Sequence, residues 1–346
     1  MRRLVFTLAL VAVAGATLAP AATGAGARHA RAPSGDPCGP GLIEVGDGLC
    51  THGGDRIPIA VERAETGVAE RADELARKMK KANPRCAGDG AKGPRIRVFY
   101  GFPADTTSRA EAFGEWIRRS VVLADSNLDR QSPGIKGQHL RMYCRNGRKV
   151  TVSAIRLLPI GQDGVFTFGD VISSLTDRQG HGLGAADFDA PRFTYVVFVD
   201  NVTCCYGPAG QGTIYYDDRA DPAGNFNNLL PAGPRFAMVE IGGTPSAGAY
   251  IFLHEVGHTL GAVQDSAPHS SGAGHCYTGA DVMCYADGGP WFQGGGSMES
   301  VCPPMPDGQR PFDCEGGDYY ELDPAPGSYL DAHWNTADSG WLTRPG

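Results

Sequence analysis

The sequence lacks several motifs that identify common enzyme classes. Its ten cysteines form no CxxC pair, which argues against a zinc-ribbon module. It contains no nucleophile elbow, no phosphate-binding P-loop and no dinucleotide-binding glycine fingerprint, which argues against elbow-type serine hydrolases and nucleotide-binding enzymes. After residue 18 no stretch is long and apolar enough to cross a bilayer, so a protein with several membrane spans is excluded.

The chain has fewer basic than acidic residues, and its formal net charge is -7 at pH 7. An acidic surface argues against nucleic acid and against anionic lipid as partners. Hydrophobic residues make up 42% of the chain, which is enough for one substantial core at this length. We therefore expect a soluble globular protein.

The start of the chain has the pattern of a signal peptide over residues 1–27. Residues 1–3 are basic, residues 4–18 are apolar, and Ala-x-Ala stands at residues 25–27. The alternative is a retained membrane anchor, which the cleavage-site pattern disfavours. Ten cysteines in an exported chain are typical of disulfides rather than of a metal cluster. We expect a secreted, extracellular protein without membrane contact once the signal peptide is removed.

The mature chain divides into an N-terminal extension, residues 28–93, and a larger region, residues 94–346. In the extension, Cys38 and Cys50 are expected to close a small loop, and an amphipathic helix is expected over residues 59–82. The larger region has mixed helix and strand patterns. Strands are expected at residues 96–102, 139–143, 149–157, 193–199, 213–216 and 236–241, and helices at residues 108–129 and 166–179.

The most informative motif is His-Glu-Val-Gly-His at residues 254–258. Two histidines four residues apart lie on one face of a helix, so the imidazoles of His254 and His258 can bind one Zn²⁺. Glu255 is then placed to accept a proton from a water molecule at the metal. Apolar residues at three- and four-residue spacing predict that this helix is buried, and Gly261 can end it in a left-handed turn. The alternative is a surface helix with coincidental spacing, which the apolar stripe disfavours.

The sequence HEVGHTLG at residues 254–261, together with Met-Cys-Tyr at residues 283–285, resembles the metzincin clan of zinc endopeptidases. The resemblance extends loosely over residues 94–285, and the segment 276–342 is similar to the tail of secreted actinobacterial proteins with an HExxH motif. It implies an α+β, zincin/metzincin-like fold, in which a mixed twisted sheet carries a long helix and an active-site helix. An irregular, disulfide-bearing C-terminal subdomain would follow from about residue 286. The resemblance also implies protein or peptide substrates, and we expect a monomer.

The metzincin pattern continues to a third zinc-binding histidine or aspartate, three residues after the glycine. In this chain the position is Gln264. A neutral amide is a poor zinc ligand, so another side chain has to complete the site. The candidates that follow in the sequence are Asp265, His269 and His275.

We favour His275 because of the cysteines near it. A Cys276–Cys284 disulfide would close a small loop and hold the His275 ring near the Met283 turn, beneath the metal. Met283 itself is expected to form a structural floor under the site and not a ligand. The resemblance gives Tyr285 the role of an oxyanion donor, and a packed core tyrosine is the alternative for the same residue.

Other cysteines carry weaker signals. The segment Pro-Arg-Cys that ends at Cys86 resembles the cysteine switch of matrixin zymogens, in which a thiolate caps the zinc. We favour a disulfide from Cys86 to Cys144, because an exported thiol usually pairs. Cys204 and Cys205 are adjacent and seldom bridge each other comfortably, so one of them is expected to pair elsewhere or to stay free.

Two acidic loops are candidates for Ca²⁺, although neither has the spacing of an EF-hand. Solvated loop carboxylates are the commoner explanation for such patterns. His333 is expected to be packed or hydrogen-bonded in the tail and not to be a ligand. The candidate calcium ligands are Asp217, Asp218 and Asp221 in the first loop and Asp313, Glu315 and Asp318 in the second.

The sequence therefore predicts a secreted zinc endopeptidase, with zinc ligands at His254, His258 and His275 and catalytic roles for Glu255 and Tyr285. Zn²⁺ lowers the pKa of water and polarises a carbonyl, and Glu255 is the general base. One alternative is a zinc-binding, non-catalytic secreted protein of the same fold. The other is a zinc amidase that acts on cell-wall peptide.

Overall fold

The computed structural model describes the chain in segments separated by gaps. The signal peptide expected at residues 1–27 and the helix expected over residues 59–82 lie outside the described residues, as do Cys204 and Cys205. The described residues are 38, 41–46, 49–55, 86, 88, 90–131, 137–145, 147, 149–158, 166–176, 192–200, 209–228, 235–242, 244–300, 310–314 and 316–343.

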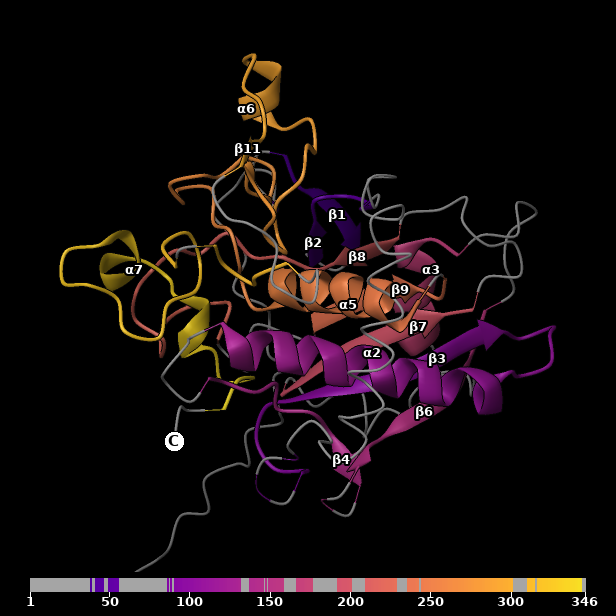
Figure 1. The fold of residues 1–346 in the computed structure, drawn as a ribbon. Helices are drawn as coiled ribbons and strands as arrows, with labels where there is room; N and C mark the ends of the chain where they lie inside the picture. Colours follow the sequence, from indigo (N-terminus) through magenta and orange to yellow (C-terminus); the bar gives the residue numbers. More distant parts are fainter. Residues whose placement is uncertain are drawn as a thin grey trace, which may run out of the picture.

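A five-stranded sheet forms the centre of the molecule, with the strand order β6-β3-β7-β9-β8 (Figure 1). Four of the strands run parallel to their neighbours, and β8 is antiparallel at one edge. The prediction of an α+β chain with a mixed sheet is therefore confirmed. The strands are β3 (Arg95–Pro103), β6 (Val152–Leu157), β7 (Phe193–Val199), β8 (Gly210–Gly212) and β9 (Arg235–Glu240).

The central strand β7 is buried at all seven of its positions. A strand that is covered on both faces has a continuous apolar sequence instead of an alternating one, and β7 reads FTYVVFV. Its side chains alternate between two cores. Val196 and Phe198 belong to the larger core, and Tyr195 and Val197 belong to the core on the opposite face.

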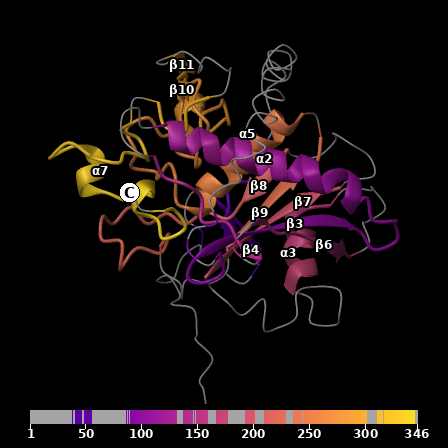
Figure 2. The same ribbon diagram turned by 60° about the horizontal axis from the view of Figure 1, so that its bottom comes forward.

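Two long helices cover one face of the sheet and a shorter helix covers the other (Figure 2). The long helices, α2 (Ala110–Arg130) and α5 (Pro245–Thr259), lie side by side. They approach closely at Gly248, where an added Cβ would overlap the Trp116 ring. The shorter helix is α3 (Phe168–Thr176). Because α5 also packs on β8 and β9, it lies next to the antiparallel edge of the sheet.

Two of the expected strands differ in the structure. The strand expected at residues 213–216 is wrong, because the residues that pair with β9 at this edge are those of β8. Residues 139–143 form isolated bridges at Leu140 and Met142 and no longer strand. A small antiparallel hairpin follows, with β4 (Cys144–Arg145) and β5 (Lys149–Val150).

The remaining elements are short, and the tail that contains several of them reaches the core. Trp341 belongs to the larger core, and the indole N–H of Trp334 donates to the carbonyl of Leu260 at 2.9 Å, just after α5. The short elements are β1 (Ile43–Gly46), β2 (Leu49–Thr51), β10 (Thr278–Gly279), β11 (Glu299–Ser300), α6 (Pro290–Gln293), α7 (Tyr329–Ala332) and the 3-10 helix η3 (Thr336–Asp338).

Three disulfides join cysteines whose pairing was expected from the sequence: Cys38–Cys50, Cys86–Cys144 and Cys276–Cys284. The disulfide interpretation of Cys86 is therefore confirmed, and this residue does not offer a thiolate to a metal. Cys314 is also disulfide-bonded, and the described part of the chain contains no free cysteine. No described helix is long and apolar enough to span a bilayer.

Candidate metal centre

Helix α5 carries the His-Glu-Val-Gly-His motif in its last two turns. Its start is fixed by Thr244, whose hydroxyl accepts from the Ala247 N–H at 3.3 Å, and by a proline in the first turn. Its end is fixed by Gly261, which has a φ of 77° and lies so close to Asn227 that an added Cβ would overlap that side chain. The helix is buried along almost its whole length, so its polar motif faces the interior.

The imidazoles of His254 and His258 face each other, with 3.1 Å between their Nε2 atoms. His254 Nδ1 lies 2.8 Å from the Val282 carbonyl oxygen, which makes Nδ1 the donor and leaves a lone pair on Nε2. Both residues are buried, with 3% and 0% of their surface exposed. Burial, followed by the neighbouring histidines, holds the pKa of His258 well below its usual range, so its ring is neutral and able to bind a metal.

His275 reaches the same point from the loop after α5. The Cys276–Cys284 disulfide closes this loop, and His275 Nδ1 lies 2.9 Å from a carboxylate oxygen of Asp287, which leaves Nε2 toward the other histidines. The ring centroids of His275 and His258 are 4.9 Å apart. Burial alone would lower the pKa of His275, but Asp55 and Asp287 outweigh it and raise the pKa to about 9.

A carboxylate that the sequence analysis missed lies among these rings. Asp55 is 3.2 Å from His254 Nε2, 3.9 Å from His258 Nε2 and 3.2 Å from His275 Nε2. Burial would raise the pKa of Asp55, but the surrounding histidines hold it well below its usual range. His52 joins the group, since its Nε2 is 3.5 Å from Asp55 and its ring lies 4.0 Å from that of His258.

Several buried polar atoms around these rings have no hydrogen-bond partner among the described residues. Leaving one such atom unpaired costs about 1–3 kcal/mol, so their convergence fits a cation as their partner. Imidazole nitrogen and carboxylate oxygen are the donor types that zinc prefers, so the residues fit the metal expected from the sequence. The unpaired atoms are both carboxylate oxygens of Glu255, Oδ2 of Asp55, and Nε2 of His275 and His52.

The possible ligand atoms form two overlapping sets. Asp55, His258, His275 and His52 offer atoms that all lie within 4.8 Å of one another, and Asp55 forms a second such set with His254 and Glu255. Asp55 is common to both sets. We call the six residues the histidine cluster.

Glu255 lies fully buried beside these ligands. Burial and then the negative charge of Asp55 raise the pKa of Glu255 well above its usual range. A carboxylate with a raised pKa is a suitable general base near neutral pH. A small cleft reaches it between α5 and the sheet edge, and its walls are Asp55, Ala209, Tyr250, Ile251, His254, Glu255 and Tyr285.

Tyr285 contacts the histidine cluster, whereas Met283 packs against helix α5. The Tyr285 hydroxyl donates to Asp55, and its ring centroid lies 4.3 Å from that of His275. Burial and the charge of Asp55 raise the pKa of Tyr285, so its phenol stays a hydrogen-bond donor. Met283 packs under α5, where its Sδ would lie 2.6 Å from a Cβ added to Gly257, which is the structural position expected for it.

The other candidates for the third ligand lie elsewhere. The Gln264 amide donates to the carbonyl of Gly261 at 2.8 Å and accepts from the Asp217 N–H at 2.7 Å, so it fastens the end of α5. His269 pairs with Asp318 at 2.7 Å, and its side chain is 41% exposed. Burial raises the pKa of Asp265, and Tyr216 is the neighbour that acts on its carboxylate. None of these residues belongs to a metal-binding set among the described residues.

The calcium candidates are not brought together either. Both carboxylate oxygens of Asp217 bond to Arg219, and one of them also accepts from the Phe226 N–H. Within the described part of the chain, neither acidic loop contributes three residues to a metal-binding set, and Glu315 lies outside that part. His333 Nδ1 lies 2.9 Å from the Tyr329 carbonyl, in the packed tail position that was expected for it.

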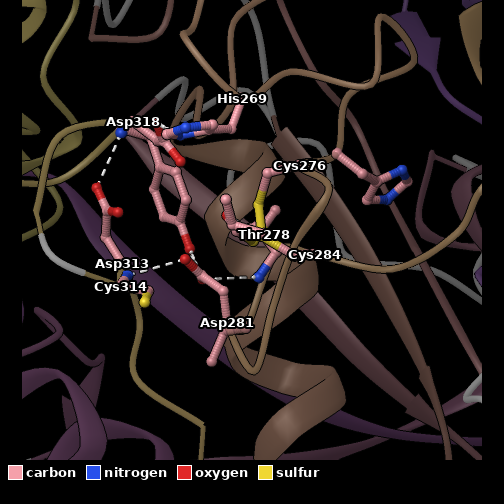
Figure 3. The surroundings of a disulfide bond; sticks show 12 residues. His269, Cys276, Thr278, Asp281, Cys284, Asp313, Cys314 and Asp318 are labelled. Carbon is pink, nitrogen blue, oxygen red and sulfur yellow. Dashed lines mark hydrogen bonds and ion pairs between the residues drawn. A yellow bond between two sulfur atoms is a disulfide. The ribbon is translucent and has the colours of Figure 1, made fainter. Parts of the chain in front are cut away.

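A second group of buried acids lies beside the Cys276–Cys284 disulfide (Figure 3). We call Asp281, Asp313 and Asp318 the acid cluster. Asp281 accepts from the Cys314 N–H at 2.8 Å and from the Tyr319 hydroxyl. Asp281 also falls within reach of the two disulfide sulfurs, but oxidised sulfur is not a thiolate ligand, so these three residues do not make a metal site.

Backbone donors surround Asp313, whereas a histidine side chain pairs with Asp318. Asp313 accepts from the N–H groups of Tyr319 at 2.9 Å and Tyr320 at 2.7 Å. Asp318 accepts from His269. The acid cluster therefore ties the tail to the loop that carries His275.

Comparisons of the chain with protein-family models, with curated proteins and with solved structures gave no match.

Proposed function

We propose that this protein is a secreted zinc endopeptidase with a metzincin-like catalytic region. The observation that carries the proposal is that the Nε2 atoms of His254, His258 and His275 all lie within 3.9 Å of Asp55, beside the buried carboxylate of Glu255. This combination supplies a metal site and a general base at one end of a cleft. The α+β fold, the mixed sheet and the helix bearing the motif agree with the resemblance seen in the sequence.

In this proposal His254, His258 and His275 hold Zn²⁺. The bound ion supplies Lewis acidity, which polarises a peptide carbonyl and lowers the pKa of water. Glu255 accepts the proton of the attacking water and delivers it to the leaving amine. Its unpaired oxygens and its raised pKa suit both steps. The Tyr285 phenol donates a hydrogen bond to the oxyanion that develops on the carbonyl.

The sheet edge supports a peptide as the substrate. β8 is the edge strand, and Ala209 beside it lines the same cleft as Glu255. An extended peptide can add to such an edge through main-chain hydrogen bonds, which places its peptide groups along the cleft. The disulfides are compatible with secretion into an oxidising environment.

The decisive test compares the zinc-loaded wild type with Glu255→Gln on casein and on a fluorogenic peptide library. Loss of the general base should lower hydrolysis by about 10²–10⁴-fold while the zinc content stays near one per chain. Glu115→Gln, an exposed change on α2, is the matched control and should match the wild type. A chelator should abolish the activity, and added Zn²⁺ should restore it.

One observation favours the non-catalytic alternative. With Asp55 among the histidines, four protein groups converge, and closed four-ligand zinc sites are generally structural. Zinc-loaded protein that hydrolyses no peptide or cell-wall amide, even after Asp55 is replaced, would support that alternative and reject the endopeptidase.

A further inference from the structure

The described part of the N-terminal extension extends the central sheet at its free edge. The Asp55 N–H donates to the Gly210 carbonyl at 2.9 Å, and the Asp55 carbonyl accepts from the Ala209 N–H at 2.6 Å. Further along, the Ile214 N–H donates to the Cys50 carbonyl at 3.0 Å. Residues 50–55 therefore run antiparallel to residues 209–214, which is the pairing an extended peptide would use.

Side chains strengthen this pairing. The Gln211 amide donates to the Thr51 hydroxyl at 3.2 Å. Leu42, Cys38 and Cys50 form a small apolar cluster with Ile214, just beyond β8. The extension thus lies on the sheet through both backbone and apolar contacts.

Asp55 of the same segment lies at the end of the cleft that holds His254 and Glu255. Asp55 and Glu255 are both cleft walls, and the Asp55 carboxylate lies between the Nε2 atoms of His254 and His275. The Tyr285 hydroxyl, which the proposed mechanism directs to an oxyanion, donates to Asp55 instead. Asp55 therefore occupies the positions that water and a substrate carbonyl would need.

We propose that residues 41–55 are a built-in inhibitor of the metal centre, with Asp55 as a detachable fourth ligand. This inference rests on the proposed endopeptidase function. It names the regulation of that site, and it makes residues 50–55 a pseudosubstrate on the edge of β8.

The disulfides allow the inhibitor to leave. Cys38 and Cys50 bond to each other, and they are the two cysteines in the first 55 residues, so no disulfide ties this segment to the rest. Cys86 bonds to Cys144 on the catalytic side. Hydrolysis of one peptide bond between residues 55 and 86 adds one water and leaves new carboxyl and amino ends. After that cleavage, residues 41–55 are held by non-covalent contacts alone.

The first test measures access to the metal without relying on catalysis. The full chain is loaded with Co²⁺, and acetohydroxamate is titrated while the visible absorption of Co²⁺ is followed. Asp55→Ala should bind acetohydroxamate at least about 10-fold more tightly than the wild type, because occlusion lowers apparent affinity by the fraction of open molecules. Glu115→Gln, an exposed change on α2 outside this segment, is the control and should match the wild type.

The second test uses a variant that leaves every residue of the cluster in place. Cys38→Ser/Cys50→Ser removes the constraint on the segment, so it should raise acetohydroxamate affinity and zinc-dependent peptide hydrolysis several-fold. Asp55→Ala should raise hydrolysis by about 10-fold or more.

Two results would overturn the inhibitor: Asp55→Ala that no longer retains Co²⁺ or Zn²⁺, or Asp55→Ala that matches the wild type in acetohydroxamate affinity and in hydrolysis. Tighter acetohydroxamate binding without hydrolysis by any variant would support occlusion and reject the endopeptidase. Equal, Glu255-dependent hydrolysis by wild type and Asp55→Ala would support the endopeptidase and reject the inhibitor.

Discussion

The loop from His275 to Tyr285 contributes to two groups of buried ionisable side chains, and the two groups differ in how their charge is satisfied. In the acid cluster, main-chain N–H groups and a phenol donate to Asp281 and Asp313. In the histidine cluster, imidazole nitrogens face one another and the carboxylate of Asp55. A buried polar group that is paired can be purely structural, whereas convergent unpaired groups need a ligand.

The two clusters also differ in the pKa values of their buried aspartates. Burial raises the pKa of Asp281 to about 7 and that of Asp313 well above its usual range, so the acid cluster lowers its own charge by taking up protons. One oxygen of Asp313 is unpaired, and a proton on that carboxyl can serve it. In the histidine cluster the pKa of Asp55 is instead held low by the surrounding histidines. Of the two clusters, the histidine cluster is the one whose side chains suit a bound cation.

The largest expected effect is a difference in zinc affinity between variants of His275 and of His269. His275→Ala should weaken zinc binding by more than about 100-fold, because the loss of even an outer partner of a metal ligand typically costs 10–100-fold. His269→Ala should leave zinc affinity within about 3-fold, since His269 pairs with Asp318 and not with the histidine cluster. Competition titration with a fluorescent chelator measures both. Equal affinities in the two variants would reject His275 as a ligand.

A smaller effect, on the free energy of unfolding, is expected when Asp281 of the acid cluster is replaced. Asp281→Ala leaves the Cys314 N–H and the Tyr319 hydroxyl unpaired, which should lower the free energy of unfolding by about 2 kcal/mol. Urea unfolding at saturating zinc measures the loss. The zinc content should remain near one per chain. A variant that folds but loses its zinc would contradict the claim that the acid cluster takes no part in zinc binding.

The last expected effect is a dependence of stability on pH, which is spread over several pH units. Burial raises the pKa of Asp281 to about 7 from its ordinary value of 3.8, so the folded chain binds more protons than the unfolded chain between these values. The contribution of Asp281 to stability is therefore present below about pH 4 and is lost as the pH rises through about 7.

The isosteric variant Asp281→Asn isolates this contribution. The stability of the wild type relative to the variant should fall by at most about 1.4 kcal/mol per pH unit between pH 4 and 7, measured in excess chelator. A difference that stays flat, or that grows with pH, would show that Asp281 is charged when folded.

Local patterns in the sequence were sufficient to predict the helix that carries the motif and most strands of the sheet. Four-residue spacing placed His254 and His258 on one helix face, and a short disulfide loop brought His275 to them. The strand expected at residues 213–216 failed because β-forming side chains do not determine edge pairing. The strand that pairs with β9 is instead the glycine-rich β8.

The residues that the sequence could not reveal come from distant parts of the chain. Asp55 lies about two hundred residues before the motif and reaches it only through pairing with Ala209 and Gly210, which is not visible in a local pattern. The only signal is a histidine and an aspartate, His52 and Asp55, separated by two glycines. Asp287 gave no signal, because any loop carboxylate can hold a histidine ring.

The most direct test of the central claim is a crystal of the zinc-loaded protein with anomalous data collected on both sides of the zinc absorption edge. The account predicts one anomalous peak in the histidine cluster, about 2.0–2.1 Å from the Nε2 atoms of His254, His258 and His275. A map without a peak there, or with its zinc peak in the acid cluster instead, would contradict it.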